Sequence, residues 1–253
     1  MALPLRSRLK NGEILLGTMA TIPCVPNGEI LSSIGFDWLF VDAEHGPFSN
    51  DSLLTLLSAI GNRTPTLVRT GGPDEVAIKQ VLDMGATGII APQVNSSDQA
   101  ADVVRYARYS PAGARGVGLG RAQGYGTQFR EYLQRAKTET TVVVQAEHKD
   151  AVDCIEKTVQ IEGIDAILIG PYDLSASYGK MGELDDPLVV DAIQHVTEVC
   201  LKAKMPLGIF GLKPEAVDPY IKKGFQLIVA GVDTLLLAES AKQLLQDLKA
   251  LTS

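Results

Sequence analysis

Hydrophobic positions recur along the chain in short, nearly continuous runs, separated by turns and by segments with apolar residues at helical spacing. Such runs predict strands buried on both faces of a sheet. Eight strands are predicted: EILLGTMA (13–20), WLFVDAE (38–44), PTLVRT (65–70), GIIAPQV (88–94), TVVVQAE (141–147), AILIGP (166–171), PLGIFG (206–211) and QLIVAG (226–231).

The segments between these strands carry the helical pattern. The clearest predicted helices span residues 74–85, 97–109, 186–204 and 233–251. Strands that alternate with helices predict a parallel sheet covered on both faces. Eight such units in 253 residues match the usual size of a closed barrel. The predicted fold class is therefore α/β, a single (β/α)₈ TIM barrel domain over residues 1–253.

One segment, residues 110–140, departs from this rhythm and holds six glycines before a short helical piece. We predict a long glycine-rich loop, either functional or a flexible insertion. Its GVGLG sequence is similar to a phosphate-binding turn. A dinucleotide fingerprint, however, follows a strand and opens a helix, whereas this one follows a predicted helix. A nucleotide site is therefore disfavoured.

Charge and cysteine content limit which binding partners and which cellular compartment are expected. The formal net charge is -7 and the basic residues are dispersed, so no basic field exists to hold a nucleic acid. No apolar run has the length of a signal peptide or of a membrane span. The three cysteines are far apart, as is typical of reduced thiols. We expect a cytoplasmic protein with no membrane or nucleic-acid partner.

The barrel prediction converts sequence position into location, because the carboxyl ends of all eight strands share one rim, where barrel active sites form. Ionisable and amide side chains from several strands should meet there. They are Asp42, Glu44, His45, Arg69, Gln93, Gln145, Glu147 and Asp173. This convergence predicts an active site at the rim.

Glu147 and Asp173 are candidate metal ligands. Two carboxylates from adjacent strand ends, beside the amide of Gln145 and without a cysteine pair, suit a hard divalent cation such as Mg²⁺ or Mn²⁺. Two other interpretations stay open. The pair could act as general acid and base, as in glycosidases, or Asp173 could cap a helix while Glu147 is solvated.

Arg69 and His45 are candidate catalytic groups. The arginine fork suits a carboxylate or a developing oxyanion, although a salt bridge to a rim acid would also explain it. His45 follows Asp42 by three residues, and a nearby carboxylate can orient an imidazole and raise its basicity. Spacing therefore favours Asp42 as the partner of His45.

The motifs FDWLFVDAEHGPF, LVRT, VVQAE, ILIGPYDLSAS and RGVGLGRA, in this order along nearly the whole chain, resemble the HpcH/HpaI aldolase family. The resemblance implies a metal-dependent class II pyruvate aldolase. Such an enzyme cleaves 4-hydroxy-2-oxo acids to pyruvate and an aldehyde, or condenses them, on a (β/α)₈ barrel with Mg²⁺ or Mn²⁺, Co²⁺ being a third candidate. It also implies a homo-oligomer, a hexamer with exchanged C-terminal helices.

The same resemblance implies roles for individual residues. Glu147 and Asp173 match the metal ligands, Arg69 matches the arginine that stabilises the enolate, and Gln145 matches a substrate-side amide. The first turn after Gly170, with Tyr172 and Asp173, would hold the pyruvate carboxylate. His45 matches the base that removes the C4 hydroxyl proton. Glu44 is expected beside the metal and not among its direct ligands.

The acid that supports His45 is a point of conflict. The family pattern points to Asp83, but Asp83 is predicted to end a helix before the fourth strand, on the face opposite the rim. Both Asp42 and Asp83 are therefore retained as candidates. For a distal carboxylate on the aldehyde, Arg121 of the glycine-rich loop is the candidate.

Two residues depart from the family pattern. His148 stands where a small hydroxyl residue is usual, and we expect it either to support the site or to begin a helix. Tyr172 stands where alanine is common, and it either narrows the pocket or packs its ring. Two alternative functions share the site, an oxaloacetate decarboxylase and a non-catalytic barrel that binds a keto acid. The leucines of the last helix would serve subunit exchange or cover the barrel of a monomer.

Overall fold

The computed structural model describes residues 3–252. Eight parallel strands close into a barrel in which each strand pairs with the next and β8 pairs with β1. This confirms the predicted α/β fold and all eight predicted strands. The strands are β1 (Leu15–Ala20), β2 (Trp38–Asp42), β3 (Thr66–Arg69), β4 (Gly88–Ala91), β5 (Thr141–Ala146), β6 (Ala166–Ile169), β7 (Leu207–Gly211) and β8 (Leu227–Val232).

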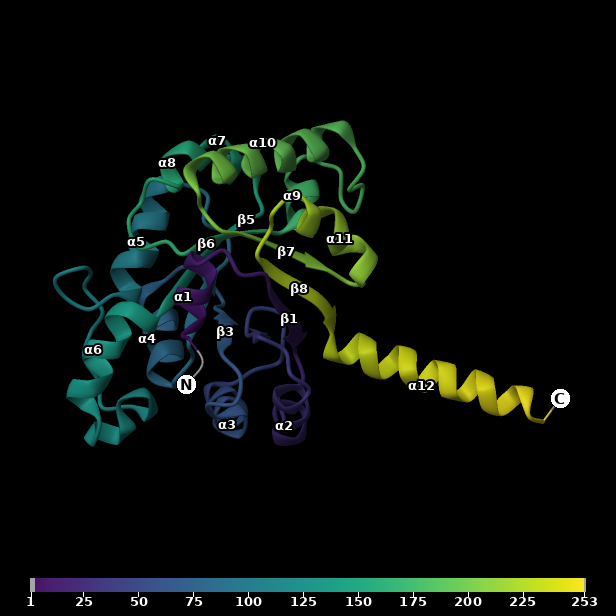
Figure 1. Ribbon diagram of the computed structural model, residues 1–253, viewed down its shortest axis with the longest axis horizontal. Helices are drawn as coiled ribbons and strands as arrows, with labels where there is room; N and C mark the ends of the chain where they lie inside the picture. The colour runs from purple at the N-terminus through teal and green to yellow at the C-terminus, as the bar shows by residue number, and fades with distance from the viewer. Residues whose placement is uncertain (1–2, 253) are drawn as a thin grey trace.

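Helices follow the strands and surround the barrel (Figure 1). The four helices predicted from apolar spacing are confirmed to within two residues at each end. In the described chain the helices are α1 (Leu5–Lys10), α2 (Val25–Ser33), α3 (Asn50–Ile60), α4 (Glu75–Asp83), α5 (Ser97–Ala107), the 3-10 helix η1 (Arg121–Gly126), α6 (Phe129–Glu139), α7 (Lys149–Asp153), α8 (Ile155–Thr158), α9 (Pro171–Ser177), α10 (Pro187–Ala203), α11 (Pro214–Lys222) and α12 (Asp233–Ala250).

The core has two layers. One layer lies between the strands and the surrounding helices, and the other fills the barrel with side chains such as Trp38, Phe40 and Leu168. Leu5 and Leu9 of α1 belong to the inner layer, so α1 closes the end of the barrel opposite the active-site rim. Because successive strand residues point to opposite faces, every second residue from Trp38 onward faces the interior.

Five strands, β2 to β6, end one to three residues earlier than predicted, and this changes where the rim residues lie. β2 ends at Asp42, where the Gly46 amide donates to the Asp42 carbonyl oxygen at 3.1 Å and closes a turn. β5 ends at Ala146, and β6 gives way at Gly170 to α9, which begins with Pro171. Glu44, His45 and Glu147 therefore lie just past the strands.

The glycine-rich segment, residues 110–140, contains η1 and α6 and lies against the end of α4. The Arg115 guanidinium binds the Asp83 carboxylate at 2.6 Å, and Arg121 donates to the Met84 carbonyl oxygen at 3.0 Å. Both contacts lie where α4 leads into the start of β4, at the end of the barrel opposite the rim. Within its own chain Arg121 is thus far from where it would hold a substrate carboxylate.

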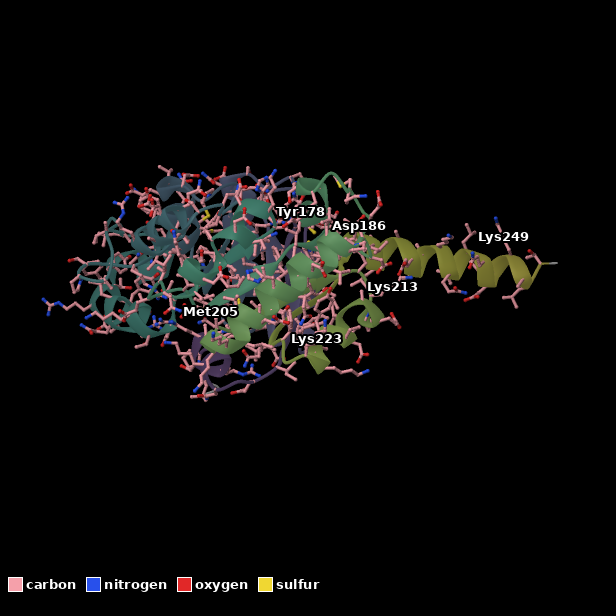
Figure 2. The ribbon with its side chains drawn as sticks, turned by 90° about the horizontal axis from the view of Figure 1, so that it is seen from above. Tyr178, Asp186, Met205, Lys213, Lys223 and Lys249 are labelled. Carbon is pink, nitrogen blue, oxygen red and sulfur yellow. The ribbon has the colours of Figure 1, made fainter. Side chains whose placement is uncertain are left out.

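The last helix, α12, projects away from the barrel and carries the C-terminus at its tip (Figure 1). Figure 2 shows the same projection from above, with Lys249 near the free end. Its outer leucines are exposed, and these are Leu236, Leu237, Leu244, Leu245, Leu248 and Leu251. The suggestion that this stripe covers the barrel of its own chain is therefore wrong. Across residues 3–252, no helix combines the length and hydrophobicity needed to span a bilayer.

Candidate active site

The predicted rim residues meet at the open end of the barrel. Asp42, Arg69 and Gln145 each lie two residues beyond an interior side chain of the same strand, respectively Phe40, Leu67 and Val143. Strand alternation therefore turns them inward and places them above the apolar layer. A cavity of about 250 Å³ is lined by Asp42, His45, Arg69, Gln145, Tyr172 and Asp173 together with apolar neighbours.

Arg69 and Asp42 form a buried two-pronged ion pair. Arg69 Nε and Nη2 donate to the two carboxylate oxygens of Asp42 at 2.8 and 2.7 Å. The guanidinium lies 5.3 Å from the centre of the Phe40 ring, and its Nε is 3.2 Å from Glu44 Oε2. Burial opposes ionisation of Arg69, but hydrogen bonds and charge from Asp42 raise its pKa above the usual value. The result is a fixed positive charge at the mouth.

Asp42 holds Arg69 and the turn after β2, not the imidazole of His45. Its Oδ1 accepts the backbone N–H groups of Glu44 and His45 at 3.2 and 3.3 Å. Burial alone would raise the pKa of Asp42, but Arg69 holds it below its usual value. The spacing in the sequence brings the Asp42 carboxylate close to the His45 backbone. Both of its oxygens, however, accept hydrogen bonds from Arg69, which is the stronger partner.

His45 reaches the cavity from the exposed turn, with 68% of its side chain accessible to solvent. The carboxylate nearest to its ring is Glu44, whose Oε2 lies 3.8 Å from Nε2. Asp83, the other candidate, ends α4 at the opposite end of the barrel, where it binds Arg115 at 2.6 Å and the Gln123 amide at 3.2 Å. The chain does not bring Asp83 to His45.

Glu147 is the buried acid of the site, with 2% of its surface exposed. Its Oε1 accepts the Gln93 backbone N–H at 2.7 Å and its Oε2 accepts the Gln145 amide. Burial raises the pKa of Glu147 to about 7, and the nearby charges of Asp173 and Glu44 act in the same direction. The suggestion of a solvated Glu147 is therefore wrong. So is that of Asp173 as a helix cap, because Gly170 is the N-cap of α9.

Gln93 contributes through its backbone, which sequence reasoning did not anticipate. It adopts φ 54°, a left-handed conformation that is uncommon outside glycine, asparagine and aspartate. This conformation accompanies the hydrogen bond from its N–H to Glu147. A backbone donor leaves no signature in residue type, so only the position of Gln93 at a strand end pointed to the rim.

A divalent cation fits the chemistry around Glu147. The Gln145 Oε1 atom is a buried acceptor without a hydrogen-bond partner in the described structure. A side chain at Gly170 would stand 2.9 Å from Glu147 Cβ and 3.0 Å from Glu147 Oε2, so glycine keeps space open beside the carboxylate. Within residues 3–252, no group of three or more His, Cys, Asp and Glu side chains is arranged to hold a metal alone. Glu147 and Asp173 would thus leave positions for water and substrate oxygens, as Mg²⁺ commonly requires.

The two residues that depart from the family pattern have different roles. His148 is the N-cap of α7, and its Nδ1 accepts the Asp150 backbone N–H at 3.2 Å. It therefore begins a helix, which was one of its two expected roles. Tyr172 lies in the first turn of α9, lines the cavity and is 41% exposed.

Known proteins resemble this chain over most of its length. A 4-hydroxy-2-oxo-heptane-1,7-dioate aldolase of Escherichia coli is 37% identical over 243 residues, which cover 94% of this chain and 92% of the relative. A 4-hydroxy-2-oxovalerate aldolase of Rhodococcus jostii is 35% identical over 241 residues, with coverage of 94% and 93%. A crystal structure of a family protein from Burkholderia cenocepacia superimposes with a TM-score of 0.92 at 32% identity, covering 97% and 98% of the two chains.

The family described as HpcH/HpaI aldolase/citrate lyase matches residues 28–240, which include every rim residue named above. Homologues that are aldolases make this chain an enzyme, a carbon–carbon lyase acting on small molecules. The arrangement of the barrel mouth and the match over most of the sequence agree: the chain belongs to the HpcH/HpaI aldolase/citrate lyase family.

Proposed function

We propose that this enzyme cleaves 4-hydroxy-2-oxo acids to pyruvate and an aldehyde, in a reversible and metal-dependent reaction. The observation that carries the proposal is the Asp42–Arg69 pair at the mouth, beside a buried carboxylate, Glu147, whose pKa is raised to about 7. The fixed positive charge of Arg69 lies next to carboxylates that can bind a metal ion. This combination suits a reaction in which negative charge develops on a 2-oxo acid.

Glu147 and Asp173 would hold the divalent cation, Mg²⁺ or Mn²⁺ with Co²⁺ as a third candidate. When bound, such a cation supplies Lewis-acid stabilisation of charge on the 2-oxo group. Gln145 donates to Glu147 and so orients this carboxylate, and its free Oε1 lies at the same cavity. The first turn of α9, with Tyr172 and Asp173, would line the pyruvate end of the substrate.

Arg69 and His45 would divide the chemistry. His45 accepts the proton of the C4 hydroxyl group, the C3–C4 bond breaks, and the electron pair moves to the 2-oxo oxygen as the enolate of pyruvate. Arg69, already oriented by Asp42, stabilises the charge on that oxygen. Glu44 lies beside both groups and stabilises the imidazolium that His45 becomes. Transfer of the proton from the His45 imidazolium to C3, directly or through water, then yields pyruvate and restores neutral His45.

We further propose that the enzyme is a homo-oligomer, a hexamer by family resemblance. Exposed leucines on a projecting helix favour packing against a second copy. The resemblance that pairs Asp83 with His45 cannot be met inside one chain, because the two residues lie at opposite ends of the barrel. In an oligomer Asp83 would serve the His45 of a neighbouring copy. Three free cysteines support the expected cytoplasmic location.

The test measures pyruvate released from 4-hydroxy-2-oxo acids and from oxaloacetate, with added Mg²⁺ or Mn²⁺ and with EDTA. We expect metal-dependent cleavage of the hydroxy acids. Turnover of oxaloacetate alone would favour the decarboxylase, and binding without turnover of either compound would favour a keto-acid-binding protein. Among variants, Glu147→Ala and Asp173→Ala should lose metal binding, whereas His45→Ala should bind metal normally in calorimetry and lose cleavage.

A further inference from the structure

A second cavity adjoins the candidate active site. Its volume is about 380 Å³, and it lies between α9, the end of β7 and α11. Three residues, Pro171, Tyr172 and Phe210, line both this cavity and the active-site cavity. The two spaces therefore share a wall. Tyr172 in this wall is next in sequence to Asp173, the proposed metal ligand.

The lining of the second cavity is mainly apolar. Leu184, Ile209, Leu212 and Ala216 contribute to it along with the shared wall. Of the described residues that line it, only Lys213 and Glu215 are charged. Lys213 lies at the base of α12 (Figure 2), and its Nζ is 3.6 Å from the Glu239 carboxylate. Its charge is thus partly compensated, and the cavity offers an uncharged group more than it offers an anion.

Position and chemistry together suggest a use for this space. The 2-oxo acid end of the substrate belongs beside Glu147 and Asp173, so the chain beyond C4, which leaves as the aldehyde, must extend away from them. The wall formed by Tyr172 and Phe210 is where such a chain would meet the second cavity. Apolar groups gain about 0.8 kcal/mol for each methylene that is buried, a factor of about four in kcat/KM.

We propose that the second cavity binds the apolar tail of the aldehyde, and that Tyr172 marks the boundary between the part of the pocket that holds the tail and the part that holds the reacting carbons. The substrate class is thereby aldehydes with an uncharged chain of several carbons, and their 4-hydroxy-2-oxo acid adducts. This inference rests on the proposed aldolase function and specifies its substrate.

The experiment measures kcat/KM in the condensation of pyruvate with acetaldehyde, butanal and hexanal, and with succinic semialdehyde, which ends in a carboxylate. We expect a rise of about fourfold for each added methylene, and butanal should exceed succinic semialdehyde. Leu212→Trp should fill the cavity from an exposed position outside the active-site lining. It should lower kcat/KM for hexanal at least tenfold, mainly through KM, and change acetaldehyde less than twofold.

Two controls make the outcome decisive. Leu188→Trp places the same side chain at another exposed leucine, away from the cavity. It should leave kcat/KM unchanged for both hexanal and acetaldehyde. Exchange of the pyruvate C3 protons in D₂O, without aldehyde, reports enolate formation independently of the tail. Absence of exchange in the metal-loaded enzyme would contradict the proposed function itself.

With exchange intact, three results would overturn the tail site. They are a flat dependence on chain length, equal losses for acetaldehyde and hexanal in Leu212→Trp, and a preference for succinic semialdehyde that Lys213→Ala abolishes. The last result would assign the cavity to a carboxylated tail held by Lys213.

Discussion

Arg69 is oriented before any substrate arrives, because both prongs of its bond go to Asp42. Buried ion pairs contribute little net stability, since desolvation offsets most of their attraction. A pair of this kind at the mouth of a barrel is better explained by the fixed charge that it offers to a reaction. The geometry depends on the planar fork of arginine, which lysine lacks.

Arg69→Lys should therefore lower kcat by about 10²- to 10³-fold, because the charge remains but is no longer aimed. Metal affinity, measured by calorimetry, should stay within about threefold of the unmodified enzyme, because Arg69 is not among the proposed metal ligands and only one charge-stabilising donor is altered. Arg105→Lys, on the exposed face of α5, is the matched control. An unchanged kcat would remove Arg69 from the chemistry.

Glu147 should make the stability of the metal-free enzyme depend on pH. Its pKa rises from 4.5 in the unfolded chain to about 7 in the fold, so folding favours the protonated form. This contribution is complete below pH 4.5 and is lost as the pH rises to about 7. A glutamine side chain cannot ionise, so Glu147→Gln should gain up to about 3 kcal/mol over the unmodified chain across this window.

Urea unfolding in EDTA at several pH values between 4 and 8 measures this difference. The variant has a constant offset from its changed hydrogen bonds, so only the slope against pH is informative. Parallel curves for the two proteins would show that Glu147 ionises normally in the fold.

Residue type and strand position predicted which side chains meet at the rim. Asp42, Arg69, Gln145 and Glu147 follow apolar strands, and barrel geometry alone sends such residues to one rim. The sequence did not predict which of these side chains bind one another. Chain spacing joined Asp42 to His45, but the closest strong partner of Asp42 comes from the neighbouring strand β3. A backbone group such as the Gln93 N–H has no sequence signal at all.

Among the secondary-structure elements, the junction of β8 and α12 is fastened by one carboxylate. Buried Asp233 accepts hydrogen bonds from the backbone N–H groups of Thr21, Ile22 and Thr234, from the Thr21 hydroxyl and from the Asn27 amide, at 2.6 to 2.8 Å. Except for Thr234, which follows Asp233 in α12, these partners lie in the segment from the end of β1 to α2, so Asp233 joins the first and last strands at the rim.

Asp233→Asn should destabilise the barrel by about 2 to 3 kcal/mol, because one acceptor oxygen becomes a donor facing other donors. Chemical denaturation monitored by circular dichroism measures the loss. Asp247→Asn on exposed α12 controls for the change of charge and should have a midpoint equal to that of the unmodified protein. Equal midpoints for both variants would mean that the junction is held by other contacts.

Apolar periodicity predicted which elements form, but not where they end. Strand ends were placed too late because the apolar pattern continues into the turns, where Gly46 and Pro171 redirect the backbone. The glycine-rich segment could not be placed either. Its position depends on Arg115, which is buried against Tyr109 and Tyr132 and binds Asp83, and such long-range packing is absent from local sequence.

At the scale of the whole molecule, the closed barrel followed from eight repeated units, whereas the direction of α12 did not. The same leucine stripe suits a helix lying on its own barrel and a helix that packs on another copy. Only the structure shows the helix extending outward with those leucines exposed.

Leu244→Asp combined with Leu248→Asp should dissociate the proposed oligomer, because each places a charge in an apolar contact. Sedimentation velocity should show a fall in mass toward the 27.0 kDa of one chain. Lys242→Asp, on the same helix, controls for added negative charge and should leave the mass unchanged. An oligomer that survives the double substitution would place the interface elsewhere.

In the proposed oligomer, the folding of the projecting helix would also depend on protein concentration. The helix has 18 residues, a length of about 27 Å, and most of the stability of a helix in a protein comes from the tertiary packing of its apolar face. Contacts with another copy would supply this packing, so mass action would govern how much of α12 is helical. Dilution should unwind its outer turns and open them to proteases while the barrel stays intact.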